Sequence, residues 1–245
     1  WPGLISLGSA VRIRLSLPSF MKNISFFCLT LNPDHEEIIK KLSYMPVGLG
    51  DKEFSKNCFS DKQGINISSK NSFYGEYTFH YWLWKNYLDL IKTEWIGFCQ
   101  YRKFFVKKKN INTKNLSFID LKDQLITEID NQTTDIDCIL GDKFSVSNYK
   151  FSKIMKRHFF HFLTNPDLFF NKKKRNLELQ FNLFHGKGNL DLAINLLDQR
   201  DRHDFKNFMY NQNCFNPHNM FACKTKLLRD YYETIFPWLE KCEKV

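Results

Sequence analysis

The chain has 245 residues, 43% of them hydrophobic, and its 25 Phe, 10 Tyr and 5 Trp exclude an intrinsically disordered protein. Its net charge of +10 favours anionic partners, which include nucleic acid, nucleotide-sugar phosphates and an acidic membrane surface. No apolar run approaches the ~20 residues of a membrane-spanning helix, so any membrane contact is expected to be peripheral.

The first part of the chain separates into a leading segment and a domain. Residues 1–20 contain several Pro and Gly and precede Met21, so we expect them to be non-native or upstream sequence. We expect residues 21–245 to form a single domain. Seven scattered cysteines without a Cys-x-x-Cys pair are typical of a reduced, cytosolic protein.

The domain is expected to begin with a buried strand and a helix. Residues 24–31 are apolar and partly β-branched up to Asn32-Pro33, which predicts a strand covered on both faces. A short helix is predicted over residues 36–42. Thr30 and Asn32 follow the end of the strand, where either a ligand contact or a plain turn would explain them.

Residues 66–105 contain the most distinctive stretch, which predicts a polar loop, a helix and a buried strand. The aromatic and apolar residues from Phe73 to Leu88 recur at steps of three and four, as on one face of a helix of roughly four turns. Asn71 or Ser72 could cap its start. Residues 95–99 then read as a strand.

Both ends of this stretch point to one binding site, because ligands bind at the carboxyl ends of strands and at helix N-termini in open α/β sheets. The candidate residues before the helix are Asn66, Ser68, Lys70 and Asn71. The candidates after the strand are Tyr101, Arg102 and Lys103. Glu76, one turn into the helix, could hold a sugar hydroxyl or could form an internal salt bridge.

The rest of the chain predicts further elements. Helices are expected over 121–129, 150–163, 177–184, 192–197 and 227–240, strands over 137–140 and near 220–222, and a polar link over 199–213. The run from Lys172 to Arg175 is either a solvated face or a lipid-headgroup contact. Asp135-x-Asp137 resembles a metal-binding pair, but it precedes its strand and a structural role is favoured. No metal site is assigned, although a divalent ion such as Mn or Mg is compatible with the chemistry.

Several motifs of this chain resemble a bacterial family, domain of unknown function 4422, found in proteins that look like glycosyltransferases of capsule and O-antigen assembly. The shared motifs are Asn66-Ile67-Ser68, Lys70-Asn71, Glu76, Thr78, Tyr81-Trp82, Trp84-Lys85-Asn86, Ile96-Gly97, Tyr101-Arg102, Phe105 and Asn219-Met220-Phe221. The chain departs from the pattern at Gly75, Gln100 and Lys103, where the family has Cys, His and Arg. The resemblance covers most of residues 21–245.

This resemblance implies an α/β domain with a GT-A-like glycosyltransferase fold, a mostly parallel central sheet flanked by helices. It implies transfer of a sugar, such as galactofuranose or another hexose, from a UDP-sugar to a capsular polysaccharide, lipopolysaccharide or lipid-linked glycan. Thr30 would lie beside the nucleotide base, and His218 and Asn219 on the acceptor side. The protein would work in the cytoplasm, with peripheral membrane contact and no role for nucleic acid.

The chemistry also needs a group that accepts a proton from the acceptor hydroxyl. Asp191 is the first candidate and His185 the second, and the family shows a similar His followed by acidic residues. Two other functions remain open from the residues alone. One is a non-catalytic binder of polyanions, either nucleic acid or anionic lipid, and the other is a nucleotidyltransferase.

Overall fold

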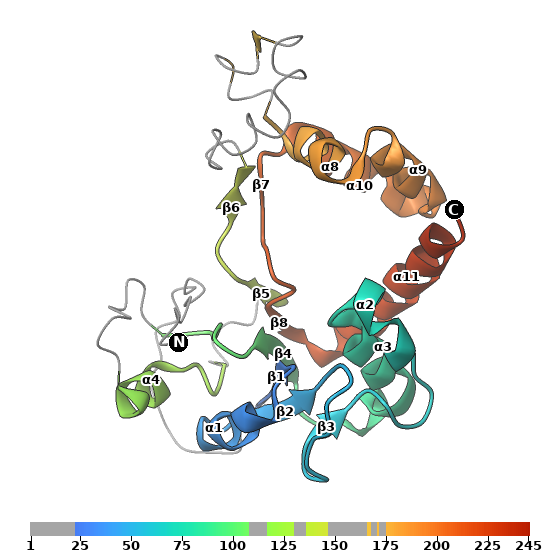
Figure 1. Cartoon of the computed structure of the whole chain (residues 1–245). Helices are drawn as coiled ribbons and strands as arrows, with labels where there is room; N and C mark the ends of the chain where they lie inside the picture. Colours follow the sequence, from blue (N-terminus) through green and yellow to red (C-terminus); the bar gives the residue numbers. More distant parts are fainter. Residues whose placement is uncertain (1–22, 108–116, 130–135, 147–165, 168–170, 172–174) are drawn as a thin grey trace. The chain divides into compact units, whose positions relative to one another are not determined.

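The computed structural model describes residues 23–107, 117–129, 136–146, 166–167, 171 and 175–245 (Figure 1). The predicted leading segment lies outside these residues, as do the helix expected over 150–163, Asp135 and most of the basic run at 172–175. The chain divides into two compact units. Residues up to 142 and 218–236 belong to the first unit, and residues 143–217 and 237–245 to the second. The single domain expected from the sequence stays a prediction.

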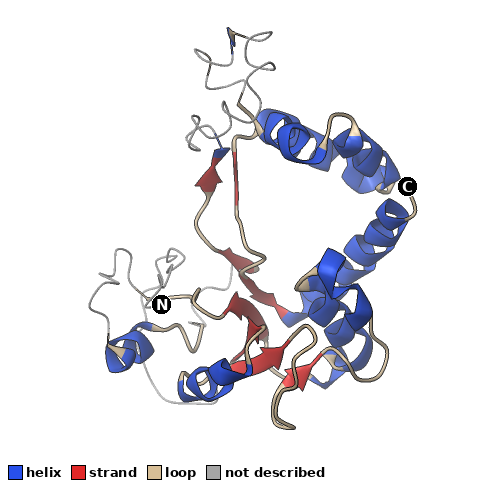
Figure 2. Cartoon of the chain, viewed as in Figure 1, coloured by secondary structure: helices blue, strands red, loops and turns tan. Residues whose placement is uncertain are grey.

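A six-stranded sheet of the described residues forms the centre of the first unit (Figures 1 and 2). In spatial order its strands are β3 (Phe59–Ser60), β2 (Met45–Gly48), β1 (Ile24–Thr30), β4 (Trp95–Gln100), β8 (Phe221–Lys224) and β5 (Cys138–Leu140). The pairs among β3, β2, β1 and β4 are parallel, whereas β8 is antiparallel to β4 and β5. The carboxyl ends of β1, β2 and β4 therefore meet at one edge.

Helices cover both faces of this sheet. Side chains alternate along β1, so neighbouring residues of this strand pack against helices on opposite faces. On one face Phe26 stacks on Tyr44, which follows α1 (Glu36–Lys41), with ring centroids 4.7 Å apart. Leu121 of α4 (Phe118–Gln124) belongs to the same buried cluster. On the other face Phe27 packs against Phe79 of α3 (Tyr77–Asn86) at 5.3 Å. The predicted sheet flanked by helices is thus observed.

The helix expected over residues 73–88 is interrupted, which is a correction to the sequence prediction. In its place the chain forms a short 3-10 turn (Ser68–Lys70), α2 (Asn71–Tyr74), α3 and a second 3-10 turn (Leu88–Leu90). Gly75 ends α2 with φ of 54° and ψ of −127°, a conformation that L side chains rarely adopt. Phe73 therefore leaves the apolar face of the helix and is 89% exposed.

The aromatic face of the interrupted helix begins instead at Tyr77. It packs against α11 (Thr225–Glu243), whose residues up to Phe236 belong to the first unit. The hydroxyl groups of Tyr77 and Tyr231 lie 2.7 Å apart, and the rings of Tyr81 and Phe236 meet edge to face at 5.1 Å. These contacts fix α3 against the rest of the first unit.

The second unit contains α8 (Leu177–His185), α9 (Asn189–Leu196), α10 (Gln199–Asn211), the C-terminal part of α11, and the antiparallel pair β6 (Phe144–Ser145) and β7 (Cys214–Phe215). The polar link expected over 199–213 is wrong, because these residues form α10. Its aromatic residues are too few to show a helical periodicity among so many charged residues. One of them, Phe205, packs on Trp238 with ring centroids 5.8 Å apart.

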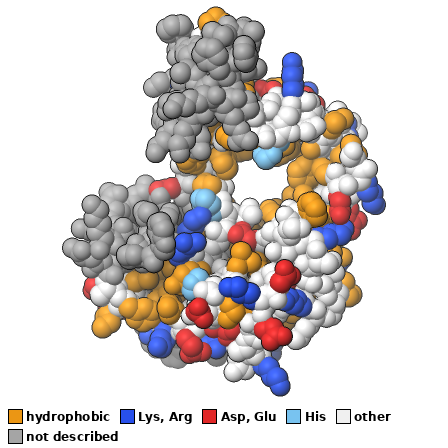
Figure 3. Space-filling model, in the orientation of Figure 1, with side chains coloured by type: hydrophobic (Ala, Val, Ile, Leu, Met, Phe, Trp, Pro, Cys, Tyr) orange, Lys and Arg blue, Asp and Glu red, His pale blue; other side chains and the backbone are white. Residues whose placement is uncertain are grey.

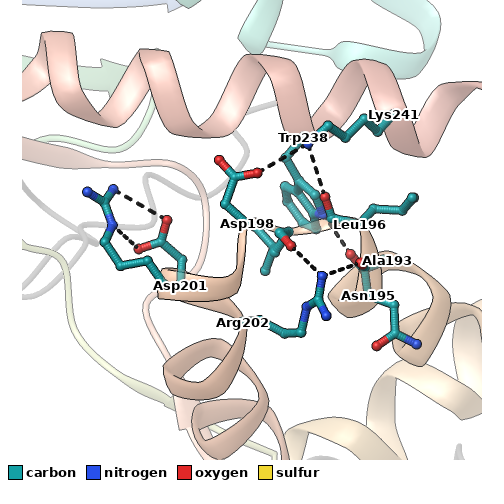
Figure 4. A network of polar contacts seen from close by, with 10 residues as sticks. Ala193, Asn195, Leu196, Asp198, Asp201, Arg202, Trp238 and Lys241 are labelled. Carbon is teal, nitrogen blue, oxygen red and sulfur yellow. Dashed lines mark hydrogen bonds and ion pairs between the residues drawn. The ribbon is translucent and has the colours of Figure 1, made fainter.

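Side chains bind the free carbonyl groups at the end of α9 (Figure 4). A helix leaves its last carbonyls without partners inside the helix. Here the indole N–H of Trp238 donates to the carbonyl of Ala193 at 2.7 Å, and Arg202 donates to the carbonyls of Asn195 and Leu197 at 2.8 and 3.0 Å. These bonds join α9 and α10 to the end of α11.

Within the described ranges, no helix is both long and apolar enough to cross a bilayer. All seven cysteines lie in these ranges and are free thiols.

We expect Gly97→Ala to destabilise the first unit. A methyl group on Gly97, in the middle of β4, would lie closer than van der Waals contact to the ring of Phe26, which stacks on Tyr44. Overpacking of this kind costs about 1–3 kcal/mol. Chemical denaturation should show it, whereas the control Gly141→Ala meets no atom within 4 Å and should leave the unfolding midpoint unchanged. Equal midpoints for the two variants would contradict the packing described for β4.

Candidate functional site

A cavity with a volume of about 860 Å³ opens at the carboxyl edge of the sheet in the first unit. Its lining comes from the end of β1 and the turn after it, the loop after β2, residues 71–76, residues 100–102 after β4, and residues 218–219 before β8. This volume is in the range of pockets for small molecules and cofactors. The cavity lies where the sequence analysis expected a ligand.

Basic side chains gather on one part of this lining. They are His35, Lys52 and Arg102. Figure 3 shows Lys, Arg and His side chains on one face of the molecule, with Asp and Glu side chains among them. Arg102 has a φ of 82°, which is uncommon for a residue with a side chain and is often found at functional sites. The two permanently charged members, Lys52 and Arg102, favour an anionic ligand.

His35 is held firmly in this group. Its ring stacks on Tyr101 with centroids 3.4 Å apart, and its Nδ1 lies 2.7 Å from the hydroxyl of Thr30. Burial lowers the pKa of His35, and the charge of Arg102 lowers it further. The ring is therefore neutral at neutral pH, and the positive charge of the cavity comes from Arg102 and Lys52.

Glu76 is the one carboxylate among the described lining residues, and two amides hold it. Gln100 donates to its Oε1, and Asn219 donates to its Oε2 at 3.4 Å. The Nε2 of Gln100 also donates to the carbonyl of His218 at 3.1 Å, and its Oε1 accepts from Lys103 at 3.4 Å. Burial raises the pKa of Glu76, and its polar neighbours offset only part of this effect.

Asn71 presents its carbonyl oxygen rather than its amide hydrogens. Its Nδ2 donates to the carbonyl of Gly75 at 2.9 Å and to the hydroxyl of Thr78 at 3.1 Å. An amide NH₂ has two hydrogens, so both are used within the protein. The Oδ1 atom can accept a hydrogen bond from a ligand.

The structure brings together seven of the site residues predicted from the sequence. Those that line the cavity are Thr30, Asn71, Glu76, Tyr101, Arg102, His218 and Asn219. His218 and Asn219 lie in a turn, with φ values of 78° and 50°. Their roles toward a ligand stay predictions, but their common location agrees with a single site.

The other predicted donor-binding residues are not among the lining residues. Asn66 holds its own loop, because its Nδ2 donates to the carbonyls of Lys62 and Gly64 and its Oδ1 accepts from the hydroxyl of Ser68 at 2.8 Å. The ammonium group of Lys70 lies 5.7 Å from the ring centre of Tyr74. Lys103 contacts Gln100 as described above. For these four residues the geometry shows structural contacts, and donor binding stays a prediction.

Sequence reasoning did not assign several residues of the cavity to it. Lys52 lies in residues 51–64, which the sequence predicts to be a polar surface loop that could fold over a ligand, but no residue of this loop was assigned to the site. His35 lies five residues after the end of the strand. A turn was expected there, so the sequence offered no reason to assign His35 to a site. Gln100 was noted only as a departure from the family pattern, yet its amide holds Glu76. Phe73 was expected to be part of the core.

The two candidate bases belong to the second unit, whereas every described lining residue of the cavity belongs to the first. Asp191 is in the first turn of α9 and accepts a hydrogen bond of 2.7 Å from the hydroxyl of Tyr210. This bond contributes most to raising the pKa of Tyr210 to about 12. His185 ends α8 with its ring 4.6 Å from that of Phe181. Their role in catalysis stays a prediction.

Among the residues that the structure describes, no three His, Cys, Asp or Glu side chains converge as metal ligands. His80, which shares a helix face with Glu76, is buried in the core and bonds Tyr232 through Nδ1 at 2.8 Å. Burial lowers the pKa of His80 to about 3. Asp137 pairs with Lys224 at 2.9 Å.

Comparison with known proteins gives two matches. A family model described as domain of unknown function (DUF4422) matches residues 32–245. An apo structure of WbbM, a bifunctional glycosyltransferase, is similar with a TM-score of 0.52 and 20% identity over 90% of this chain and 37% of that one. The chain thus spans little more than a third of the length of that protein. No curated protein matches. The likeness confirms the predicted glycosyltransferase-like α/β fold.

We expect the ionisation of Glu76 to oppose folding. Because its pKa is raised above 4.5 in the folded state, its contribution to stability is full below that value and is lost as pH rises through the folded pKa. Glu76→Gln removes this dependence. The free energy of unfolding of the variant, relative to the wild type, should therefore increase between about pH 4 and pH 7. The exposed Glu53→Gln is the control, and a difference that does not change with pH would contradict the burial of Glu76.

Proposed function

Because the chain belongs to the DUF4422 family and has the fold of a glycosyltransferase structure, we propose that it transfers a sugar from a nucleotide-sugar donor to a glycan acceptor. The observation that carries this proposal is the cavity, in which cationic side chains and a carboxylate held by amides line the carboxyl edge of a mainly parallel sheet. Nucleotide-sugars combine the two corresponding features, a diphosphate and a sugar with several hydroxyl groups.

The donor is proposed to be a UDP-sugar that carries galactofuranose or another hexose. The acceptor is proposed to be a capsular polysaccharide, a lipopolysaccharide or a lipid-linked glycan. The scattered cysteines support work in the cytoplasm, and the net charge of +10 supports peripheral contact with an anionic membrane surface. These details follow from the resemblance of the motifs and from charge.

The reaction forms a bond between the acceptor oxygen and the anomeric carbon and breaks the bond from that carbon to the diphosphate. Negative charge develops on the departing diphosphate, where Arg102 and Lys52 would stabilise it by charge-assisted hydrogen bonds. The proton of the acceptor hydroxyl passes to a base. Asp191 is proposed for that role, with His185 as the second candidate, while His218 and Asn219 contact the acceptor.

We expect Arg102→Ala to abolish the thermal stabilisation that UDP gives to the wild type, since the variant loses the cation proposed to bind the diphosphate. Arg229→Ala is the matched control, because it removes the same charge from an exposed pair with Asp89 outside the cavity. A thermal-shift series with UDP and UDP-sugars, with and without Mn²⁺, measures both.

An unchanged UDP shift in Arg102→Ala would refute the role of Arg102. Salt-sensitive binding of generic polyanions that both Arg variants weaken equally, without any effect of UDP or UDP-sugars, would favour a polyanion binder instead. Turnover of a nucleoside triphosphate would favour a nucleotidyltransferase.

We expect Asp191→Asn to lower kcat for transfer by roughly 100-fold or more, the typical contribution of a general base, while binding of UDP stays unchanged. Asp204→Asn is the control, since that carboxylate is 92% exposed and lies in the same unit. Steady-state transfer and UDP binding measure the two effects separately. Full activity of Asp191→Asn would refute the role of Asp191 as the base and leave His185 as the candidate.

A further inference from the structure

Phe73 is exposed, although the sequence predicts it on the apolar face of a helix. Its side chain is 89% exposed and belongs to the lining of the cavity. The backbone at Gly75 turns α2 away from the packed face that begins at Tyr77, so Phe73 loses the burial that normally stabilises such a side chain. Leu31, which is 61% exposed, lines the same cavity. A ligand in the cavity would cover apolar surface that the fold leaves open.

Polar atoms that accept hydrogen bonds accompany Phe73 on the same segment. Both amide hydrogens of Asn71 are bonded within the protein, which leaves its Oδ1 as an acceptor. Each carboxylate oxygen of Glu76 takes one bond from an amide and can accept another. Acceptors suit hydroxyl groups, whereas phosphate oxygens at neutral pH are acceptors themselves.

We propose that residues 71–76 form the subsite for the sugar ring of the donor, in which Phe73 covers the C–H face of the ring while Asn71 and Glu76 accept bonds from its hydroxyl groups. This inference rests on the function proposed above. A hexose ring has an apolar face and a rim of hydroxyl groups, and an aromatic side chain beside fixed polar groups is the usual arrangement of a small-molecule pocket.

The donor sugar fits this subsite better than the acceptor because of where Glu76 is held. Glu76 is held between two amides: Gln100 is only two residues before Arg102 on the same strand end, and Asn219 is proposed to contact the acceptor. A sugar linked to a diphosphate at Arg102 must lie next to that diphosphate. Residues 71–76 and 100–102 line one cavity, so a donor can contact both at once.

The test measures binding of UDP and of UDP-hexoses by calorimetry, with UDP-glucose, UDP-galactose and UDP-galactofuranose as probes. For the hexose that the wild type binds best, Phe73→Ala should weaken binding about 5-fold, the effect of one aromatic contact, and should leave UDP binding unchanged. Phe73→Tyr keeps the ring and should bind as the wild type does. Phe118→Ala, at a Phe that is 40% exposed on α4 outside the cavity, is the control for loss of a surface aromatic side chain.

Because Phe73 is exposed, its replacement should not change the melting temperature of the free protein, so a loss of binding is not a loss of folding. The inference is overturned if Phe73→Ala binds UDP-hexoses as tightly as the wild type. It is also overturned if binding of UDP falls equally, since Phe73 would then hold the nucleoside, or if only the KM of the acceptor rises. A wild type that binds neither UDP nor any UDP-hexose would refute the proposed function itself.

Discussion

The parallel pairing of β1 with β4 is the interaction on which the cavity depends. The two strands run in register from Ile24 beside Trp95 to Leu29 beside Gln100, and almost all of their side chains are buried. The pairing continues one step further, where the N–H of Tyr101 donates to the carbonyl of Leu29 at 3.0 Å. This fixes the Thr30 turn next to the Arg102 turn. A ligand at either strand end therefore meets groups from both.

Much of this fold could be predicted from the hydrophobic pattern. The positions of β1 and β4 were predicted correctly, because strands that are covered on both faces read as continuous apolar runs. The interruption at Gly75 was missed because periodicity treats a glycine as a tolerated helix residue, whereas here its backbone angles end the helix. The helix α10 was missed because most of its residues are charged or polar, and its few aromatic residues gain their partner, Trp238, from a distant part of the chain.

The candidate site was predictable where it follows a strand end and less so elsewhere. Arg102 and Thr30 were predicted for the site because strand ends are general binding positions, and both line the cavity. Asn66 and Ser68 look like ligand contacts in sequence, but their side chains bond to their own loop, and nothing in the spacing reveals which use a polar residue has. The contact of Glu76 with Asn219 joins residues 143 positions apart, which a single sequence does not disclose.

The amide of Gln100 has a consequence for how the cavity responds to acidity. The family pattern has His at this position, and an imidazole changes its charge near neutrality, whereas an amide does not. The two imidazoles that do line the cavity, His35 and His218, have pKa values lowered by burial. Burial has the opposite effect on Glu76: it raises the pKa, so this carboxylate takes up a proton at a higher pH than a free one does. A single proton, on that carboxylate, would set the electrical balance of the pocket in which the sugar is proposed to lie.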